Sequence, residues 1–277
     1  MTWTEIEKSG GLAVITGGAS GVGLAAAELL SGRGFDLLLA DRDANALEKA
    51  ASGLKAGGAS VQTAVVDVTD AAAMHKLADQ AFVSGPVAVL MNNAGMARPT
   101  GTTTEPDVWR QILDVNFYGV LNGVQAFVPR MKDAGRAAAV INTGSKQGIT
   151  TPPGNPAYNV SKAAVKVLTE QLAHELREEA SQVSAHLFVP GFTYTGMIAA
   201  FMPEKPPAAW TSAECVDYLF DRVAQGDFYI LCPDNDVTEA KDARRVLWAA
   251  GDIAENRPAL SRWHPEWKDA FTRFEGS

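Results

Sequence analysis

The chain has 277 residues, of which 47% are hydrophobic and 20% are charged, and its formal net charge is −8. This length and composition suit one large α/β domain or two small ones, and they exclude a mainly disordered chain. An acidic chain without a basic patch also argues against nucleic acid or an anionic membrane surface as a partner.

Short apolar runs alternate with helical segments as far as residue 189. The runs lack the polar alternation of half-exposed strands, so they predict strands buried on both faces, as in a parallel sheet. Alternating strands and helices predict βαβ units and a doubly wound α/β fold that binds ligands at the carboxyl ends of its strands. The predicted strands are 12–15, 35–40, 61–66, 87–91, 138–142 and 183–189, and the predicted helices are 22–30, 44–56, 71–82, 107–132 with an interruption near Pro129, and 155–179.

The pattern loosens after Pro190 and Gly191. Residues 192–210 are rich in Pro, Met and aromatic side chains and predict a loop over the site, with 198–210 as a candidate lid. Thr211 and Glu214 fit a capping box, which begins a helix to about residue 224. A last strand at 228–231, a helix at 240–250 and an irregular aromatic end follow. No repeat or linker divides the chain, so we predict a single domain with a C-terminal extension at about 234–277.

A glycine-rich turn, residues 16–23, joins the first predicted strand to the first helix. Glycines there allow a tight turn and the close approach of a pyrophosphate to backbone N–H groups at the helix N-terminus. Taken alone, such a turn is an ordinary connection between a strand and a helix about as often as it is a binding site. The strand–turn–helix context favours a dinucleotide site.

Asp41 closes the second strand and bears on the choice of dinucleotide. A carboxylate at this point can accept hydrogen bonds from the adenosine ribose and would repel a 2′-phosphate, which favours NAD. Arg42 could instead bind a 2′-phosphate and favour NADP. Position 20 is Ser, so the glycine turn itself holds no basic residue. A turn or helix-capping aspartate is the remaining alternative for Asp41.

Tyr158 and Lys162 lie about one turn apart on a predicted helix, so their side chains share a face. A neighbouring positive charge favours the phenolate and lowers the pKa of a tyrosine, which could then exchange a proton with a substrate oxygen. The pair alone is weak evidence, because such spacings are common on amphipathic helices. A core tyrosine and a solvated lysine are the alternatives.

With these residues in view, the chain resembles the short-chain dehydrogenase/reductase family in its shorter single-domain branch. The resemblance covers about residues 11–195. The family's glycine turn matches 16–23, its Asn-Asn-Ala-Gly segment matches 92–95, and its Pro-Gly after the sixth strand matches Pro190 and Gly191, with Thr195 following. Its catalytic Asn, Ser, Tyr and Lys match Asn116, Ser145, Tyr158 and Lys162.

The resemblance implies a Rossmann fold and a hydride transfer between a nicotinamide cofactor and an alcohol or ketone. Tyr158 would exchange the proton, Lys162 would hold the nicotinamide ribose and lower the Tyr158 pKa, and Ser145 would stabilise the substrate oxygen. Asn116 would hold a water linked to Lys162. The cofactor-binding part would span about 1–150 and the catalytic and substrate part about 140–233. The cofactor residues would be Gly17, Ser20, Gly21, Val22, Gly23, Asp41, Arg42, Asp67, Val68, Asn93, Ala94, Gly95, Tyr158, Lys162, Pro190, Gly191, Thr193 and Thr195.

The substrate pocket is expected to be partly apolar, because Met, Phe and Tyr side chains occur at positions that should line it. Lys146 stands where the family more often has a small or apolar residue, and it would favour a polar or anionic substrate unless it faces solvent. The candidate substrate residues are Met96, Lys146, Gln147, Asn155, Phe192 and Tyr194.

Other sites are disfavoured. The four histidines show no metal-ligand spacing, and Cys215 and Cys232 are too few for a disulfide framework and fit buried apolar positions better than nucleophiles. Residues 1–10 lack a signal-peptide layout, and no apolar run reaches the length of a membrane span, so we expect a cytoplasmic protein.

The expected function is an NAD(H)-dependent oxidoreductase that interconverts a secondary alcohol and a ketone. An NADPH-dependent carbonyl reductase that uses Arg42 is the first alternative, and a cofactor-binding protein without turnover is the second. The family implies a homodimer or homotetramer. The aromatic tail with Trp263 and Trp267 puts the tetramer in doubt, and its simplest role is to pack on its own domain.

Overall fold

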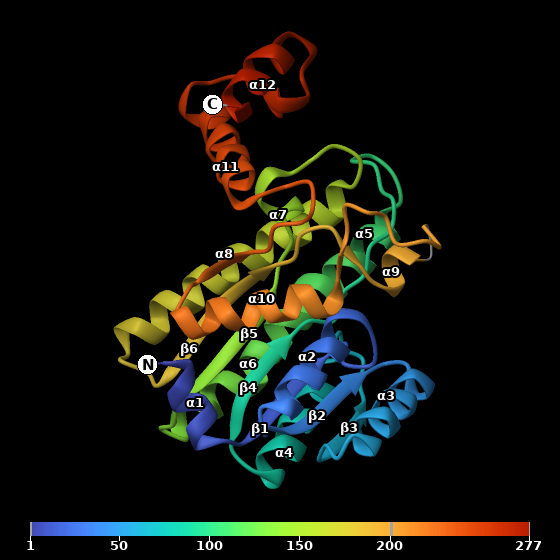
Figure 1. Cartoon of the computed structure of the whole chain (residues 1–277), viewed down its shortest axis with the longest axis vertical. Coiled ribbons are helices and arrows are strands. Elements are labelled where there is room, and N and C mark those ends of the chain that lie inside the picture. Colours follow the sequence, from blue (N-terminus) through green and yellow to red (C-terminus); the bar gives the residue numbers. More distant parts are fainter. Residues whose placement is uncertain (1, 200–201, 277) are drawn as a thin grey trace.

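The computed structural model describes residues 2–199 and 202–276, and its strands and helices alternate as predicted (Figure 1). In chain order the main elements are α1 (Trp3–Ser9), β1 (Leu12–Thr16), α2 (Gly21–Gly32), β2 (Asp36–Asp41), α3 (Ala44–Ala56), β3 (Val61–Val65), α4 (Ala71–Ser84), β4 (Val87–Asn92), α5 (Pro106–Leu113), α6 (Gly119–Asp133), β5 (Ala138–Thr143), α7 (Gln147–Thr150), α8 (Pro156–Glu178), β6 (Val183–Val189), α10 (Ser212–Gln225), β9 (Tyr229–Leu231) and α11 (Glu239–Ala254).

Within the described residues, seven strands form one parallel sheet in the order β3-β2-β1-β4-β5-β6-β9. The strand order reverses between β1 and β4, and the predicted doubly wound fold is confirmed. In such a sheet, a ligand crevice forms outside the carboxyl ends of the strands at this reversal.

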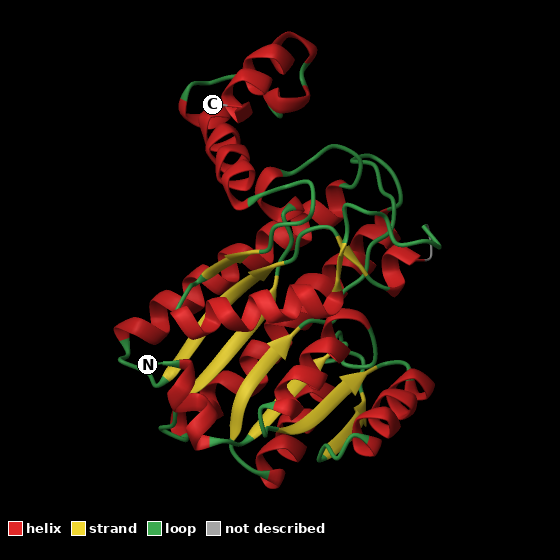
Figure 2. Cartoon of the chain, viewed as in Figure 1, coloured by secondary structure: helices red, strands yellow, loops and turns green. Residues whose placement is uncertain are grey.

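Both faces of the sheet are covered by helices, which explains the unbroken apolar runs (Figure 2). Along β1, Ala13 and Ile15 pack in the layer with α2, α3 and α10, whereas Leu12 and Val14 pack in the layer with α4, α6 and α8. Successive side chains of a strand point to opposite faces, so each face needs its own apolar set. The edge strand β3 is mostly exposed.

The long helix predicted at 107–132 is interrupted at a different place from the one expected. A π-helical turn, Asp114–Tyr118, separates α5 from α6, and α6 continues through Pro129. The N–H of Gly119 bonds to the carbonyl of Asp114, so one extra residue is accommodated at this point. Such turns often occur at functional sites, and this one carries Asn116.

The loop after β6 includes a short parallel pair of strands, β7 (Thr193–Tyr194) and β8 (Trp210–Thr211), which the sequence did not predict. A helical turn, α9 (Gly196–Ala199), lies between them. The candidate lid at 198–210 includes residues 200 and 201, which lie outside the described residues, and its closure remains a prediction.

The C-terminal extension forms an arm beyond the sheet and its covering helices (Figure 1). The arm consists of α11, two short 3-10 turns at Ser261–Trp263 and Pro265–Trp267, and α12 (Lys268–Gly276), which the sequence did not predict. The Trp248 ring lies 5.4 Å from the ring of Phe271 and 6.2 Å from that of Trp267. The arm therefore has a small aromatic core of its own, and its base rests on α7.

Candidate active site

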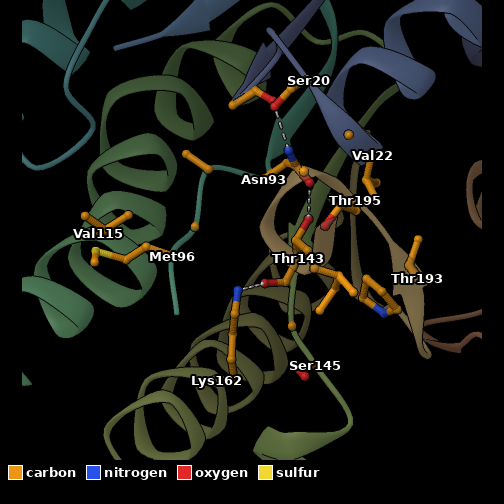
Figure 3. A pocket seen from close by; sticks show the side chains of 18 of the residues that line it. Ser20, Val22, Asn93, Met96, Val115, Thr143, Ser145, Lys162, Thr193 and Thr195 are labelled. Atoms are coloured by element: carbon orange, nitrogen blue, oxygen red, sulfur yellow. Dashed lines mark hydrogen bonds between the residues drawn. The ribbon is translucent and has the colours of Figure 1, made fainter. Parts of the chain in front are cut away.

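A cavity of about 700 Å³ lies at the carboxyl ends of the central strands, where the fold predicts a ligand site (Figure 3). The glycine turn, the segment after β4, the loop after β5 and the segment after β6 all contribute to its lining. Of the predicted site residues, Gly23, Asn116, Asn155 and Tyr194 lie outside the lining. The predicted residues that line the cavity are Gly17, Ser20, Gly21, Val22, Asp41, Arg42, Asp67, Val68, Asn93, Ala94, Gly95, Met96, Ser145, Lys146, Gln147, Tyr158, Lys162, Pro190, Gly191, Phe192, Thr193 and Thr195.

The glycine turn is built so tightly that two of its positions exclude any side chain. Gly17 has a φ of 64°, and a Cβ there would lie 2.9 Å from the Cα of Ala94. A Cβ on Gly23 would overlap the carbonyl oxygen of Gly17 and lie 2.8 Å from Nδ2 of Asn93. The resulting bare N-terminus of α2 faces the cavity and fits a pyrophosphate.

Asn93 ties three strand ends together beneath this turn. Its Nδ2 donates to the carbonyl oxygens of Thr16 (3.2 Å) and Gly17 (3.3 Å), and its Oδ1 accepts from the Thr143 hydroxyl at 3.4 Å (Figure 3). The Thr16 hydroxyl accepts from the backbone N–H of Asn93 at 3.0 Å. Asn93 was predicted to line the cofactor site, and the structure adds this bracing role.

Asp41 faces the glycine turn, and it does not cap the next helix, although its Oδ1 accepts from the N–H of Asp43 at 3.1 Å and so closes the turn before that helix. Its Oδ2 accepts from the backbone N–H of Ala19 at 3.2 Å, whereas α3 is capped by Asp43, whose carboxylate accepts from Asn45 and Ala46. The carboxylate of Asp41 therefore stands at the cavity wall, where a ribose would reach it. Arg42 lines the same wall with an exposed side chain.

Tyr158, Lys162 and Ser145 meet at the carboxyl end of β5. Helix α8 begins at Pro156 and carries the half-buried Tyr158 and the buried Lys162 about one turn apart. Ser145 lines the same cavity as Tyr158, and its Oγ accepts from the N–H of Gln147 at 3.2 Å. Lys162 Nζ donates to the carbonyl oxygen of Thr143 at 2.7 Å and lies 5.8 Å from the Tyr158 ring centroid (Figure 3).

Burial changes the acidity of both groups. It raises the pKa of Tyr158 above its ordinary value, although the hydrogen bond from Ser145 acts in the opposite direction, and it lowers the pKa of Lys162 to about 8. The pKa of Tyr158 is therefore raised, whereas Lys162 was predicted from the sequence to lower it. The reason is that taking a phenolate out of water is costly and that the ammonium points to Thr143.

Asn116 is buried and uses its amide within the protein. Its Oδ1 accepts from the N–H of Met96 (2.8 Å), and its Nδ2 donates to the Met96 carbonyl (2.9 Å) and to Ser161 Oγ (3.0 Å). Ser161 in turn donates to the carbonyl of Tyr158 at 2.8 Å. The π turn thus joins the loop after β4 to α8, and the water expected at Asn116 remains a prediction.

Three substrate predictions need correction. Asn155 accepts from Thr100 at 3.1 Å, and the Tyr194 hydroxyl donates to the carbonyl of Pro203, so both lie outside the cavity lining. Lys146 does line the cavity, but its ammonium forms ion pairs with Asp234 and Asp242. It therefore neither faces solvent nor carries a free charge for an anionic substrate.

Sequence reasoning missed two residues near the site. Asp234 lines the cavity and follows β9, and its place after a strand at the carboxyl edge of the sheet was an available signal. Asp242 comes from the arm, and nothing in the sequence indicated that this segment reaches the catalytic loop. Within the described part of the chain, no helix is long and apolar enough to cross a membrane.

Residues 11–206 match the family model described as short chain dehydrogenase. The chain belongs to the short-chain dehydrogenase/reductase family. It is an oxidoreductase of the alcohol dehydrogenase and ketoreductase class that binds a nicotinamide cofactor, and the predicted family, fold and enzyme class are confirmed.

Several characterised relatives cover most of this chain. It is 30% identical to 1-deoxy-11-beta-hydroxypentalenate dehydrogenase of Streptomyces exfoliatus, over 91% of this chain and 93% of the relative. It is 37% identical to galactitol 2-dehydrogenase (L-tagatose-forming) of Cereibacter sphaeroides, over 73% and 79%. A crystal structure of a short-chain dehydrogenase/reductase from Burkholderia phymatum in complex with NAD superimposes with a TM-score of 0.82 at 32% identity, over 90% of this chain and 96% of that one.

Proposed function

We propose that the protein is an NAD(H)-dependent oxidoreductase that interconverts a secondary alcohol and a ketone, with Tyr158 as the acid and base. The observation that carries this proposal is that Ser145, Tyr158 and Lys162 line one cavity together, with the Lys162 ammonium 5.8 Å from the Tyr158 ring centroid. A binding protein without turnover needs none of these groups.

The chain's residues divide the work between holding a cofactor and moving a proton. Gly17, Gly23 and the N-terminus of α2 would hold the pyrophosphate, Asp41 the adenosine ribose, and Lys162 the nicotinamide ribose. When bound, the nicotinamide supplies or accepts the hydride. Ser145 would orient the substrate oxygen by a hydrogen bond, and Tyr158 would donate its phenol proton to that oxygen in reduction and accept it back in oxidation.

The substrate is proposed to be small and partly apolar. Met96, Val115, Phe192 and Ile198 line the cavity together with Ser145. This lining combines apolar side chains with a polar group that can fix the orientation of an oxygen. We also propose a cytoplasmic homo-oligomer that acts without nucleic acid, membrane or metal.

An absorbance assay at the NADH band tests the proposal. NADH and NADPH are supplied separately with small, aromatic and bulky ketones, and NAD is supplied with the matching alcohols. Turnover with NADH supports the proposal. Turnover with NADPH alone would retain the chemistry but replace NAD by NADP as the cofactor, with Arg42 binding its 2′-phosphate. Tight cofactor binding without turnover across the panel would favour a binding protein.

Asp41→Asn is expected to move the cofactor preference towards NADPH. The amide oxygen can still accept from the N–H of Ala19, at the loss of the second bond from the N–H of Asp43, and the amide lacks the charge that would repel a 2′-phosphate. We expect the ratio of kcat/KM for NADPH to that for NADH to rise by about tenfold or more, the equivalent of roughly 1.4 kcal/mol. Asp36→Asn, at the opposite end of the same strand, is the control and should leave the ratio unchanged. An unchanged ratio in Asp41→Asn would remove the argument for NAD.

A further inference from the structure

Lys146, directly after Ser145, is the centre of a buried cluster of charges. Its Nζ lies 2.6 Å from the carboxylate of Asp242 and 3.6 Å from that of Asp234. The two acidic side chains are only 7% and 6% exposed. We call these three residues the Lys146 cluster.

The three members come from different parts of the chain. Lys146 belongs to the loop that carries Ser145, Asp242 lies in the first turn of α11 in the arm, and Asp234 follows β9. Asp234 Oδ2 also accepts from the N–H of Phe192 at 3.3 Å, and its Oδ1 accepts from the N–H of Val237 at 2.8 Å. The cluster thus joins the loop after β5, the segment after β6 and the base of the arm.

The short helix α7, which follows Ser145, is packed between α11 and α8. On one side α7 packs against α11. On the other side it lies on the backbone of α8, where a Cβ added to Gly148 would come within 2.6 Å of the Lys162 carbonyl oxygen. A shift of the arm would therefore move α7, and with it Ser145, relative to Tyr158 and Lys162.

The cluster is better suited to fixing positions than to stabilising the fold. Charges removed from water lose hydration energy, and an apolar set of the same volume often stabilises a protein equally well or better. An ion pair, however, holds its two charged atoms close together, here at 2.6 Å. Burial raises the pKa of Asp242, while Lys146 and Arg245 act against that rise and Asp234 adds to it. The short Lys146–Asp242 contact offsets part of the hydration energy that the two charges lose on burial.

We propose that Lys146, Asp234 and Asp242 are positioning residues that hold Ser145 against Tyr158, so that the C-terminal arm is a working part of the active site. The inference rests on the proposed function, because it takes Ser145 to act on the substrate oxygen. It gives the arm a role other than packing, and it explains why a charged residue follows Ser145.

The test compares Lys146→Met, Asp242→Asn, the double variant of both, and Lys146→Arg, which keeps the charge. Glu275→Gln is the matched control, because Glu275 pairs with Arg245 at 2.6 Å within the same arm but lies outside the cluster. Each variant is measured for kcat and KM with the best ketone of the panel, for NADH affinity, for thermal unfolding, and for hydrogen exchange of residues 145–150.

The expected result is a fall in kcat of about tenfold or more in Lys146→Met and Asp242→Asn, since misplacement by about 1 Å can cost a hundredfold. NADH affinity should stay within about twofold, because the cluster does not hold the cofactor. Exchange at 145–150 should rise in both variants, Lys146→Arg should recover part of kcat, and Glu275→Gln should match the wild type.

Wild-type kcat and exchange in folded Lys146→Met and Asp242→Asn would overturn the proposal. If a single variant fails to fold because it leaves an unpaired charge, the double variant decides, since it removes both charges of the 2.6 Å pair while Asp234 keeps its backbone N–H donors from Phe192 and Val237. It should fold and still show the lowered kcat, whereas wild-type kcat in it would overturn the proposal. Ser145→Ala distinguishes a failure of the proposed function from a failure of the positioning role alone. Normal turnover in that variant would overturn the proposed function, and the positioning role with it.

Discussion

Tyr158→Phe is expected to reduce turnover by about a thousandfold, within the range of roughly 10² to 10⁴ that a positioned acid or base contributes. Phenylalanine keeps the ring that lies beside Lys162 but has no hydroxyl to exchange a proton. The fold should persist, because the substitution removes a single buried oxygen and leaves the packing in place.

The measurement is steady-state kcat with NADH and a ketone from the panel, alongside the dissociation constant of NADH from fluorescence. NADH affinity should change little, because the glycine turn and Asp41 are untouched. Tyr118→Phe is a suitable control, since it also removes a tyrosine hydroxyl, and Tyr118 is 49% exposed and does not line the cavity. Near-normal kcat in Tyr158→Phe would exclude Tyr158 as the acid and base.

Gly23→Ala is expected to lower kcat/KM by about a hundredfold, through displacement of the turn that would hold the pyrophosphate. The added methyl group would overlap the backbone carbonyl of Gly17 and crowd Nδ2 of Asn93 at 2.8 Å. The Gly17 carbonyl is backbone, and Asn93 Nδ2 is held by hydrogen bonds to the carbonyl oxygens of Thr16 and Gly17, so the turn itself must move. Overpacking of this kind also destabilises a protein by about 1–3 kcal/mol.

Gly32→Ala is the matched control for Gly23→Ala, because both residues belong to α2 and the substitution is the same. A Cβ on Gly32 would meet no neighbour within 4 Å, and alanine favours a helix by about 1 kcal/mol over glycine. Gly32→Ala should therefore bind NADH normally and unfold at an equal or higher temperature. Equal NADH affinity in the two variants would show that the turn does not hold the cofactor.

The α/β order was predictable because each central strand is apolar on both faces. The run at 12–15 and the run at 87–91 became β1 and β4 with ends shifted by one residue at most, since burial on both faces leaves no polar position within them. Helix 44–56 agreed at both ends, where Asp43 caps the first turn and Gly57 follows the last.

The elements that were missed depend on packing between distant segments. Helix α1 is held by Trp3, whose ring lies 5.1 Å from that of Phe220, and no local pattern reports that contact. The break at 114–118 was expected near Pro129, because proline is the visible helix breaker. The π turn instead coincides with the three hydrogen bonds that Asn116 makes with Met96 and Ser161.

The sequence by itself determined the fold class and the glycine turn, because buried strands and a side-chain-free turn are local properties, and its resemblance to the family supplied the candidate catalytic set. The tertiary structure alone decided what Lys146 does. The sequence allowed a solvent-facing or substrate-binding lysine, and only the folded chain brings Asp234 and Asp242 to its ammonium. Contacts between residues almost a hundred positions apart depend on how whole elements pack, which no short pattern encodes.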